Sequence, residues 1–198
     1  MITGIILASG FSRRMKRDKL LMEIEGMKLI ERVIEACINS NLDDIILVYR
    51  VDDLKKIGEK YSIKSIYNEK AHLGQSEGLK LGVREATRAD SYMFLVGDQP
   101  FLTSELINTL IKEYKESYLP ILVPYYNGHR GMPMIISSIF REELLNITGD
   151  KGGRDIVQKN ISKVKKIYIE EEKLGMDIDN EEDLNILKES LKVNDNSK

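Results

Sequence analysis

Short apolar runs alternate with amphipathic stretches along the first part of the chain. Largely apolar runs, typical of strands buried on both faces, occupy residues 4–8, 44–49 and 92–96, and residues 63–67 form a weaker strand pattern. Apolar side chains at helical spacing predict helices at residues 27–39, 75–88 and 103–116. This rhythm of strand and helix predicts an α/β fold whose mostly parallel sheet is covered by helices on both faces.

The pattern changes from Pro120 onward. Two extended segments around a polar turn come first, then a helix, a glycine-bearing loop, a short helix, a strand and a last helix. We expect the extended segments at residues 121–126 and 132–137, the first helix at 138–146, the strand at 164–169 and the last helix at about 181–191. No repeat or low-complexity linker divides the chain. We therefore expect one domain over residues 1–192, with a disordered tail at 193–198.

Composition and charge exclude several classes of protein. Hydrophobic residues make up 42% of the 198 residues, and 30 basic against 32 acidic side chains leave a net charge of −2. That balance argues against nucleic acid or an anionic membrane as a partner. No apolar run approaches the ~20 residues of a membrane span, and the first residues lack a signal-peptide pattern. The single cysteine, Cys37, excludes an internal disulfide, so we expect a cytoplasmic protein.

The loop after the first strand combines small and basic residues. Ala8, Ser9 and Gly10 would let a ligand approach the backbone, and five basic side chains follow between residues 13 and 19. Arg14 and Lys19 are placed to neutralise phosphates. The loop has neither the spacing of a Walker A motif nor that of a dinucleotide-binding glycine motif. The alternative interpretation is a solvated basic turn.

Two further loops carry carboxylates. Asp98 directly follows the strand at 92–96, where a rigidly held carboxylate suits Mg²⁺, although an ordinary capping turn would look the same. Asp177 and Asp179 alternate along a segment that we expect to be extended, so at most one should face the same ion as Asp98. Residues 181–183 read as the acidic first turn of the last helix.

The remaining reactive side chains do not suggest a site. His72 and His129 lie in separate polar loops with no partner at metal-ligand spacing, so we interpret both as surface residues. Cys37 lies on the apolar stripe of a predicted helix and is interpreted as a core residue. No serine lies in a nucleophile elbow, which disfavours a hydrolase.

Six sequence blocks together resemble the MobA-like nucleotidyltransferases. LASGFSRRMKRDKLL resembles the opening of that family, and the other blocks follow in the family's order over residues 2 to about 187. They are GQSEGLKLGV, VGDQPFL, HRGMPMII, GDKGGRDIV and DIDNEEDL. The KLL ending followed by GMKLIERVIE is most similar to the molybdenum cofactor cytidylyltransferases. The chain departs from the family pattern at Ser9, Lys16, Gly78 and Met132.

The resemblance implies a Rossmann-like three-layer α/β/α fold of the nucleotide-diphospho-sugar transferase type. It divides the domain into a nucleotide-binding half, to about residue 118, and an acceptor-binding half at about 119–180. The implied reaction is a Mg²⁺-dependent transfer of CMP from CTP to the terminal phosphate of a molybdopterin-type cofactor, with release of pyrophosphate. A molybdoenzyme or its chaperone would receive the product. The alternatives are a guanylyltransferase, a transferase for another phosphorylated acceptor, or a nucleotide-binding protein without activity.

The resemblance also implies roles for particular residues. The catalytic set is Arg14, Lys19 and Asp98. The nucleotide-binding set is Leu7, Ala8, Ser9, Gly10, Lys19, Gln75, Ser76 and Asp98. The Mg²⁺ ligands are Asp98 and Asp177, and the acceptor-binding set is Arg130, Gly131 and Arg154. Because the Cβ and hydroxyl of Ser9 should crowd a two-ring purine more than a pyrimidine, we expect CTP to be preferred over GTP.

Overall fold

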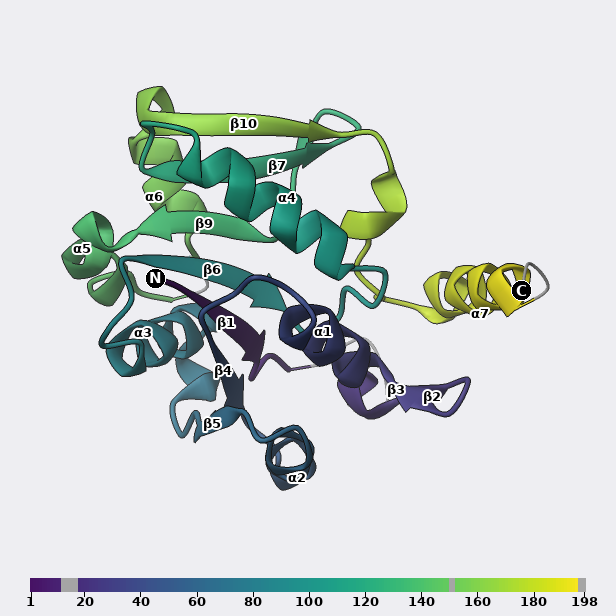
Figure 1. Ribbon diagram of the computed structural model, residues 1–198. Helices are drawn as coiled ribbons and strands as arrows, with labels where there is room; N and C mark the ends of the chain where they lie inside the picture. Colours follow the sequence, from purple (N-terminus) through teal and green to yellow (C-terminus); the bar gives the residue numbers. More distant parts are fainter. Residues whose placement is uncertain (12–17, 150–151, 196–198) are drawn as a thin grey trace.

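The computed structural model describes residues 1–11, 18–149 and 152–195. Its main sheet contains β1 (Ile2–Ala8), β4 (Asp44–Tyr49), β5 (Lys64–Tyr67), β6 (Ser91–Val96), β7 (Ile121–Tyr126), β8 (His129–Arg130), β9 (Met134–Ser137) and β10 (Val164–Ile169). Their order is β10-β7-β9-β6-β1-β4-β5, and β8 pairs with β7 (Figure 1).

Parallel pairing dominates this sheet, as predicted. β1 pairs in parallel with β4 and β6, β4 with β5, and β10 with β7. The exceptions are β9, which runs antiparallel to both β6 and β7, and the short β8, which runs antiparallel to β7. β7 and β9 correspond to the two extended segments that the sequence predicted, and β8 lies within the polar turn between them.

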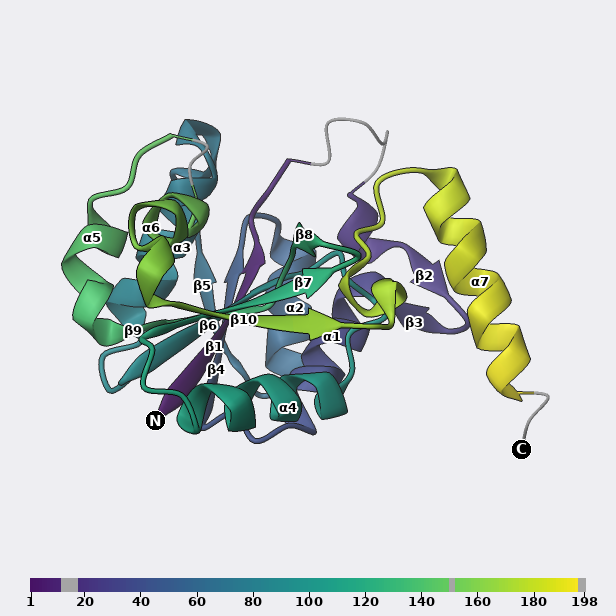
Figure 2. The same ribbon diagram turned by 90° about the horizontal axis from the view of Figure 1, so that it is seen from above.

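Helices cover both faces of the sheet (Figures 1 and 2). They are α1 (Leu29–Ile38), α2 (Asp52–Lys60), α3 (Gln75–Glu85), α4 (Ser104–Lys115), α5 (Arg141–Leu145) and α6 (Arg154–Lys159). The last helix, α7 (Glu181–Asp195), lies apart from these layers. Alternation along β1 separates two cores: Ile6 packs with residues of α1, α2 and α4, and Ile5 packs with residues of α3, α5 and α6. The three-layer prediction is confirmed.

Three local elements differ from the sequence prediction. The helix expected from residue 27 begins at Leu29, because β2 (Glu23–Ile24) and β3 (Met27–Lys28) form a hairpin. Glu25 and Gly26 turn it with φ of 52° and 74°, the left-handed conformations that such tight turns need. Helix α2 was not predicted, since its buried face holds only Leu54, Ile57 and a glycine. Helix α7 runs past the expected end and includes residues 193–195 of the predicted tail.

A third, smaller core attaches α7 to this hairpin. Its buried members come from β2, α1, the segment before α7 and α7 itself: Ile24, Leu29, Ile178, Leu184 and Leu187. Figure 2 shows α7 alongside β2 and β3, beyond the edge of the three layers. None of the described helices has the length and apolar character that a membrane span requires.

We predict that Leu187→Ala destabilises the protein by about 2–4 kcal/mol, the range for emptying a buried leucine site that relaxes only in part. Leu187 is completely buried in the third core, whereas the neighbouring Lys188 is exposed. Lys188→Ala is therefore the matched control and should change stability by under about 0.5 kcal/mol. Denaturant titration of both variants measures the difference, and equal free energies of unfolding would show that this core is not stabilising.

Candidate active site

The carboxyl ends of four parallel strands meet at one edge of the sheet. Ala8 at the end of β1 pairs with Tyr49 at the end of β4, and Leu7 pairs with Val96 at the end of β6. The loop Ser9–Gly10 and the turn that contains Asp98 therefore begin side by side. This is the edge at which α/β proteins of this kind bind ligands.

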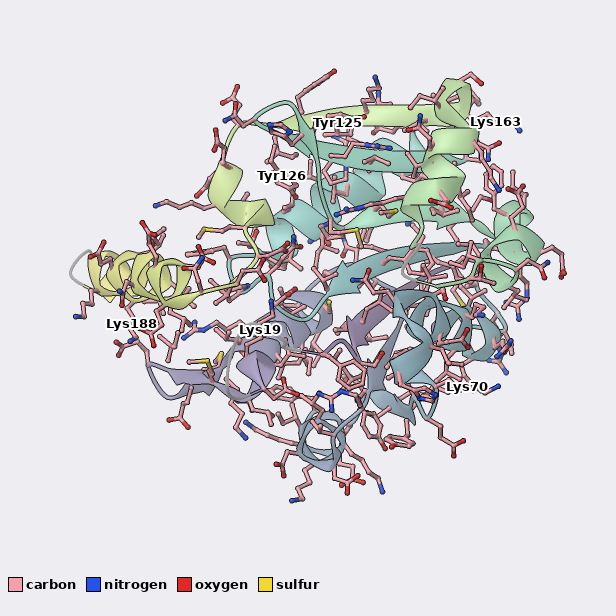
Figure 3. All side chains as sticks on the ribbon, turned by 180° about the vertical axis from the view of Figure 1, so that it is seen from behind. Lys19, Lys70, Tyr125, Tyr126, Lys163 and Lys188 are labelled. Atoms are coloured by element: carbon pink, nitrogen blue, oxygen red, sulfur yellow. The ribbon has the colours of Figure 1, made fainter. Side chains whose placement is uncertain are left out.

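Lys19 joins this edge to the C-terminal part of the chain. It begins a short 3-10 turn, Lys19–Leu21, that Asp18 caps by accepting a hydrogen bond from the Leu20 amide. Lys19 Nζ lies 2.7 Å from Asp98 Oδ2 and 2.8 Å from Asp179 Oδ1. Figure 3 shows Lys19 between the sheet and α7. Burial lowers the pKa of Lys19, but the charges and hydrogen bonds of the two carboxylates outweigh it and raise that pKa, so the ammonium stays charged.

Two hydrogen bonds dock the segment 175–179 onto the turn after β6. The Ile178 amide donates to the Asp98 carbonyl at 3.0 Å, and Gln99 Nε2 donates to the Gly175 carbonyl at 2.9 Å. Because residues 176–179 form no regular strand, the alternation expected for Asp177 and Asp179 does not hold. Asp179 shares the Lys19 ammonium with Asp98, and the charge of Asp98 acts on Asp177 as well.

Asp177 lies in a strongly negative environment. Although the residue as a whole is exposed, protein atoms around its carboxyl desolvate it, and this raises the pKa of Asp177 to about 6. The nearby Asp98 carboxylate acts in the same direction, and a hydrogen bond from Gln99 acts against it. A divalent cation between the two carboxylates would relieve this repulsion.

The donor set fits Mg²⁺. Asp98 and Asp177 offer only carboxylate oxygens, which this ion prefers, and Mg²⁺ commonly takes one or two protein carboxylates with water and phosphate as its other ligands. Within the described ranges, no group of three or more His, Cys, Asp or Glu side chains could hold a metal ion. Two protein carboxylates would leave the other coordination positions of the ion to water and phosphate oxygens.

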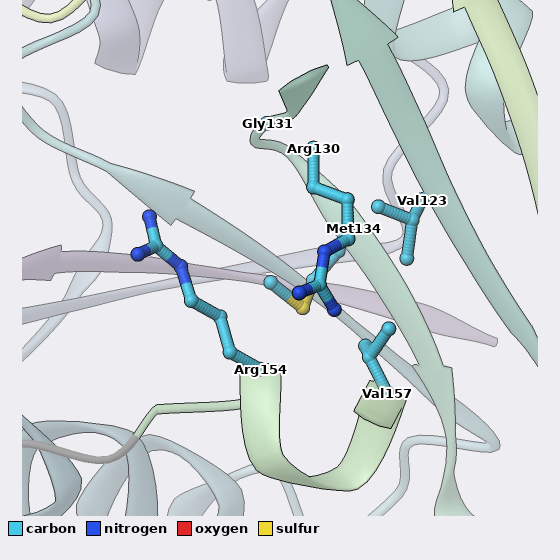
Figure 4. Close-up of a pocket in the computed structure, with 6 residues that line it drawn as sticks. All are labelled: Val123, Arg130, Gly131, Met134, Arg154 and Val157. Atoms are coloured by element: carbon cyan, nitrogen blue, oxygen red, sulfur yellow. The ribbon is translucent and has the colours of Figure 1, made fainter. Parts of the chain in front are cut away.

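The structure brings the three predicted acceptor-binding residues together. Arg130, Gly131 and Arg154 line one pocket, whose apolar lining is Val123, Met134 and Val157. Figure 4 shows the arginine side chains approaching it from different elements, with Met134 between them. Arg130 belongs to β8 and Arg154 begins α6, and both are exposed. Such a pocket can pair an apolar ring with anionic groups.

The other predicted residues lie in different environments. Ala8 is buried, Gln75 is exposed at the start of α3, and Ser76 is completely buried with its hydroxyl unpaired among the described residues. Arg14 lies outside the described residues, so its role stays a prediction. His72 and His129 are exposed as predicted, and Cys37 is a core residue whose thiol pKa is raised by burial.

The sequence analysis missed Asn68 and Arg50 at this edge, and it did not foresee that Asp179 pairs with Lys19. Asp179 holds Lys19, and Asn68 Nδ2 donates to Ser9 Oγ at 2.9 Å. The Arg50 guanidinium lies 4.5 Å from the centre of the Phe11 ring and 3.3 Å from Asp18 Oδ2. Asn68 and Arg50 each directly follow a predicted strand, and this position is the signal that could have found them.

Comparison with known proteins identifies the family. Residues 4–164 match the MobA-like NTP transferase domain. The chain belongs to this family. It is thus a domain of the nucleotidyltransferase class, which confirms the predicted family. A relative in Natranaerobius thermophilus, named a probable molybdenum cofactor guanylyltransferase, is 32% identical over 138 residues. This match spans 65% of the chain and 62% of the relative's length.

Solved structures of similar proteins confirm the fold type. Rv0371C of Mycobacterium tuberculosis in complex with manganese superposes with a TM-score of 0.77 at 22% identity, covering 96% of this chain and 98% of that one. A nucleotidyl transferase from Methanothermobacter, Mth528, gives a TM-score of 0.79 at 19% identity and covers 96% and 97% of the two chains.

We predict that Asp177→Asn stabilises the metal-free protein above pH 6. The carboxyl has a pKa of about 6 in the folded chain against an ordinary value of 3.8, so the folded state holds its proton more tightly. The stability of the wild-type protein therefore falls as the pH rises from about 4 to about 6, and the variant escapes this loss. Because Asp177 is exposed, we expect a gain under about 1 kcal/mol.

Thermal unfolding at pH 4 and pH 8, in the presence of a chelator, measures this difference. The two proteins should unfold at similar temperatures at pH 4, and the variant should unfold at a higher temperature than the wild type at pH 8. Equal temperatures at pH 8 would contradict the repulsion between Asp177 and Asp98.

Proposed function

We propose that this protein transfers a nucleotidyl group from a nucleoside triphosphate to the terminal phosphate of a molybdopterin-type cofactor, with release of pyrophosphate. The observation that carries the proposal is the convergence of Lys19, Asp98 and Asp177 at the sheet edge where the loop Ala8–Gly10 begins. The molybdenum cofactor as acceptor is supported by the name of the Natranaerobius relative.

The reaction needs alignment and charge neutralisation more than proton transfer. An oxygen of the acceptor phosphate attacks the α-phosphorus, and the bond from that phosphorus to the oxygen bridging to the β-phosphate breaks. Near neutral pH the acceptor phosphate is already ionised, since its second pKa is about 6, so no general base is required. Two polyanions must nevertheless be brought together, and positive charge placed between them supplies most of the catalysis.

Lys19 is the cation that we propose for this task. In the absence of nucleotide its ammonium is held by Asp98 and Asp179. A triphosphate at this edge would compete for that ammonium, while Asp179 keeps it near the site. Arg14, five residues earlier on the same loop, is proposed to contact the α-phosphate or the leaving pyrophosphate.

Asp98 and Asp177 are proposed to hold Mg²⁺. When bound, the ion would neutralise phosphate charge and polarise the oxygens around the α-phosphorus. The backbone hydrogen bond from Ile178 to Asp98 holds the two segments together, and this supports the proposal. In the same way Arg130, Gly131 and Arg154 are proposed to bind the acceptor, with the apolar lining of their pocket against its ring system.

The proposal also includes the identity of the nucleotide base. We propose CTP, because the KLL ending followed by GMKLIERVIE is most similar to the molybdenum cofactor cytidylyltransferases. The hydroxyl of Ser9, which we expected to crowd a purine, is instead buried and accepts a hydrogen bond from Asn68. GTP is the second candidate, favoured by the name of the Natranaerobius relative. The reducing cytoplasm is the proposed compartment, which suits a chain whose one cysteine is buried.

We predict that Asp98→Asn lowers kcat about a hundredfold or more, because loss of a metal ligand removes several kcal/mol of transition-state stabilisation. The assay follows pyrophosphate release with molybdopterin cofactor and saturating Mg²⁺. Asp53→Asn is the control, since Asp53 lies on α2 and pairs only with Lys56 at the surface. Retention of more than half of the wild-type rate by Asp98→Asn would exclude Asp98 as a metal ligand.

We predict that kcat/KM is higher for CTP than for GTP, and that Ser9→Gly narrows this preference, because the loop Ala8–Gly10 loses the buried hydrogen bond to Asn68 that fixes its backbone. Both triphosphates are compared in the wild type and the variant under the same conditions. A wild-type protein that uses GTP at least as well as CTP would overturn the cytidylyl assignment and leave the nucleotidyltransferase proposal standing.

A further inference from the structure

The loop Ala8–Gly10 is held by a buried hydrogen bond to a residue far along the chain. Ser9 and Asn68 are 9% and 3% exposed, and Asn68 Nδ2 donates to Ser9 Oγ at 2.9 Å. Asn68 directly follows β5, and its backbone amide donates to the carbonyl of Tyr49 at 2.8 Å. One asparagine thus connects the ends of β1, β4 and β5.

The orientation of the Asn68 side chain is fixed by its other partner. The Lys70 amide, which can only donate, lies 3.2 Å from Asn68 Oδ1. The oxygen of the side-chain amide therefore faces Lys70, and the NH₂ group faces Ser9. Ser9 Oγ consequently accepts this hydrogen bond, and its position is set by the segment that leads into α3.

Gly78 provides the space that this contact needs. A β-carbon at position 78 would lie 2.8 Å from Ser9 Oγ and 3.4 Å from Asn68 Nδ2. Glycine inside a helix is about 1 kcal/mol less favourable than alanine, and Gly78 lies within α3. A residue of low helix propensity therefore stands where the backbone of α3 passes close to the Ser9 hydroxyl.

We propose that Asn68, Ser9 and Gly78 form one positioning unit for the nucleotide. The unit sets the backbone of Ala8–Gly10 against the first turn of α3, where Gln75 is exposed, so it acts on nucleotide affinity through these segments. Asn68 and Gly78 are positioning residues in this proposal. It rests on the proposed function insofar as the loop Ala8–Gly10 binds a nucleoside triphosphate.

The test measures equilibrium binding of CTP and of GTP, each with Mg²⁺, to the full chain, with KM and kcat as a second readout. Asn68→Ala should weaken binding of the preferred triphosphate about tenfold, the effect of losing one buried hydrogen bond with its partner left unpaired. At saturating nucleotide the kcat of Asn68→Ala should differ less than twofold from that of the wild type, because Asn68 is not proposed to contact the reacting atoms. Asn146→Ala is the control: it removes an amide hydrogen bond to the Glu142 carbonyl on α5 and should leave binding unchanged.

Two double variants separate positioning from general destabilisation. Ser9→Ala with Asn68→Ala should bind no more weakly than Asn68→Ala alone, because both changes remove the same contact. Gly78→Ala should weaken binding about tenfold although alanine favours the helix, and adding Ser9→Gly should weaken it no further, because both changes disrupt the same contact with Asn68. Free energies of unfolding, measured in parallel, should not follow the order of the binding constants.

The possible failures are distinguishable. If the wild-type protein binds neither triphosphate, the proposed function fails. If the wild type binds a triphosphate and Asn68→Ala and Gly78→Ala bind it equally well, the positioning unit is rejected and the proposed function stands. Additive effects in either double variant would likewise overturn the coupling between the three residues.

Discussion

The parallel pairing of β1 with both β4 and β6 is the constraint on which the rest of the site depends. It brings the ends of these strands to one edge, so the loop after Ala8 and the turn at Asp98 begin next to each other. Each strand is buried on both faces, since neighbouring residues such as Ile5 and Ile6 pack into different cores. A shift of register by one residue would move each of these side chains into the opposite core, where the packing does not fit it, so the packing that fixes the register also fixes the site.

Lys19 and its two carboxylates turn this edge into a place for phosphates. One carboxylate comes from the turn after β6 and the other from the segment before α7, and a single ammonium is shared between them. The third carboxylate, Asp177, is destabilised in its charged form by burial and by Asp98. The site without ligand therefore contains more negative charge than it can satisfy, and a divalent cation with a triphosphate would correct that imbalance.

The packing of α7 outside the site helps to hold residues 177–179, which precede this helix, beside Asp98. Leu184 and Leu187 pack against the β2–β3 hairpin in a small core of their own. Asn180 and Asp183 cap the start of the helix, and Asp183 Oδ2 accepts a hydrogen bond from the Asp179 amide at 2.7 Å. The local capping pattern that looked purely structural thus also fixes the backbone of a residue that holds Lys19.

The sequence by itself predicted the class of fold, most strands and helices, and the loops that carry the site. Continuous apolar runs and helical spacing record burial directly, so they identified β1, β4 and β6 without further information. The same signals were too weak for α2, with its two large buried side chains, and could not place the hairpin turn ahead of Leu29.

Only the tertiary structure decided which side chains meet. Asp179 joins Lys19 across 160 positions of sequence, and Asn68 joins Ser9 across 59. Alternation failed for Asp179 because the segment is held by hydrogen bonds to the turn after β6 and forms no strand of its own. The role of Gly78 likewise depends on how close α3 lies to Ser9, a distance set by packing between layers. Local patterns encode which face of an element is buried, whereas contacts between distant residues arise when those faces pack together.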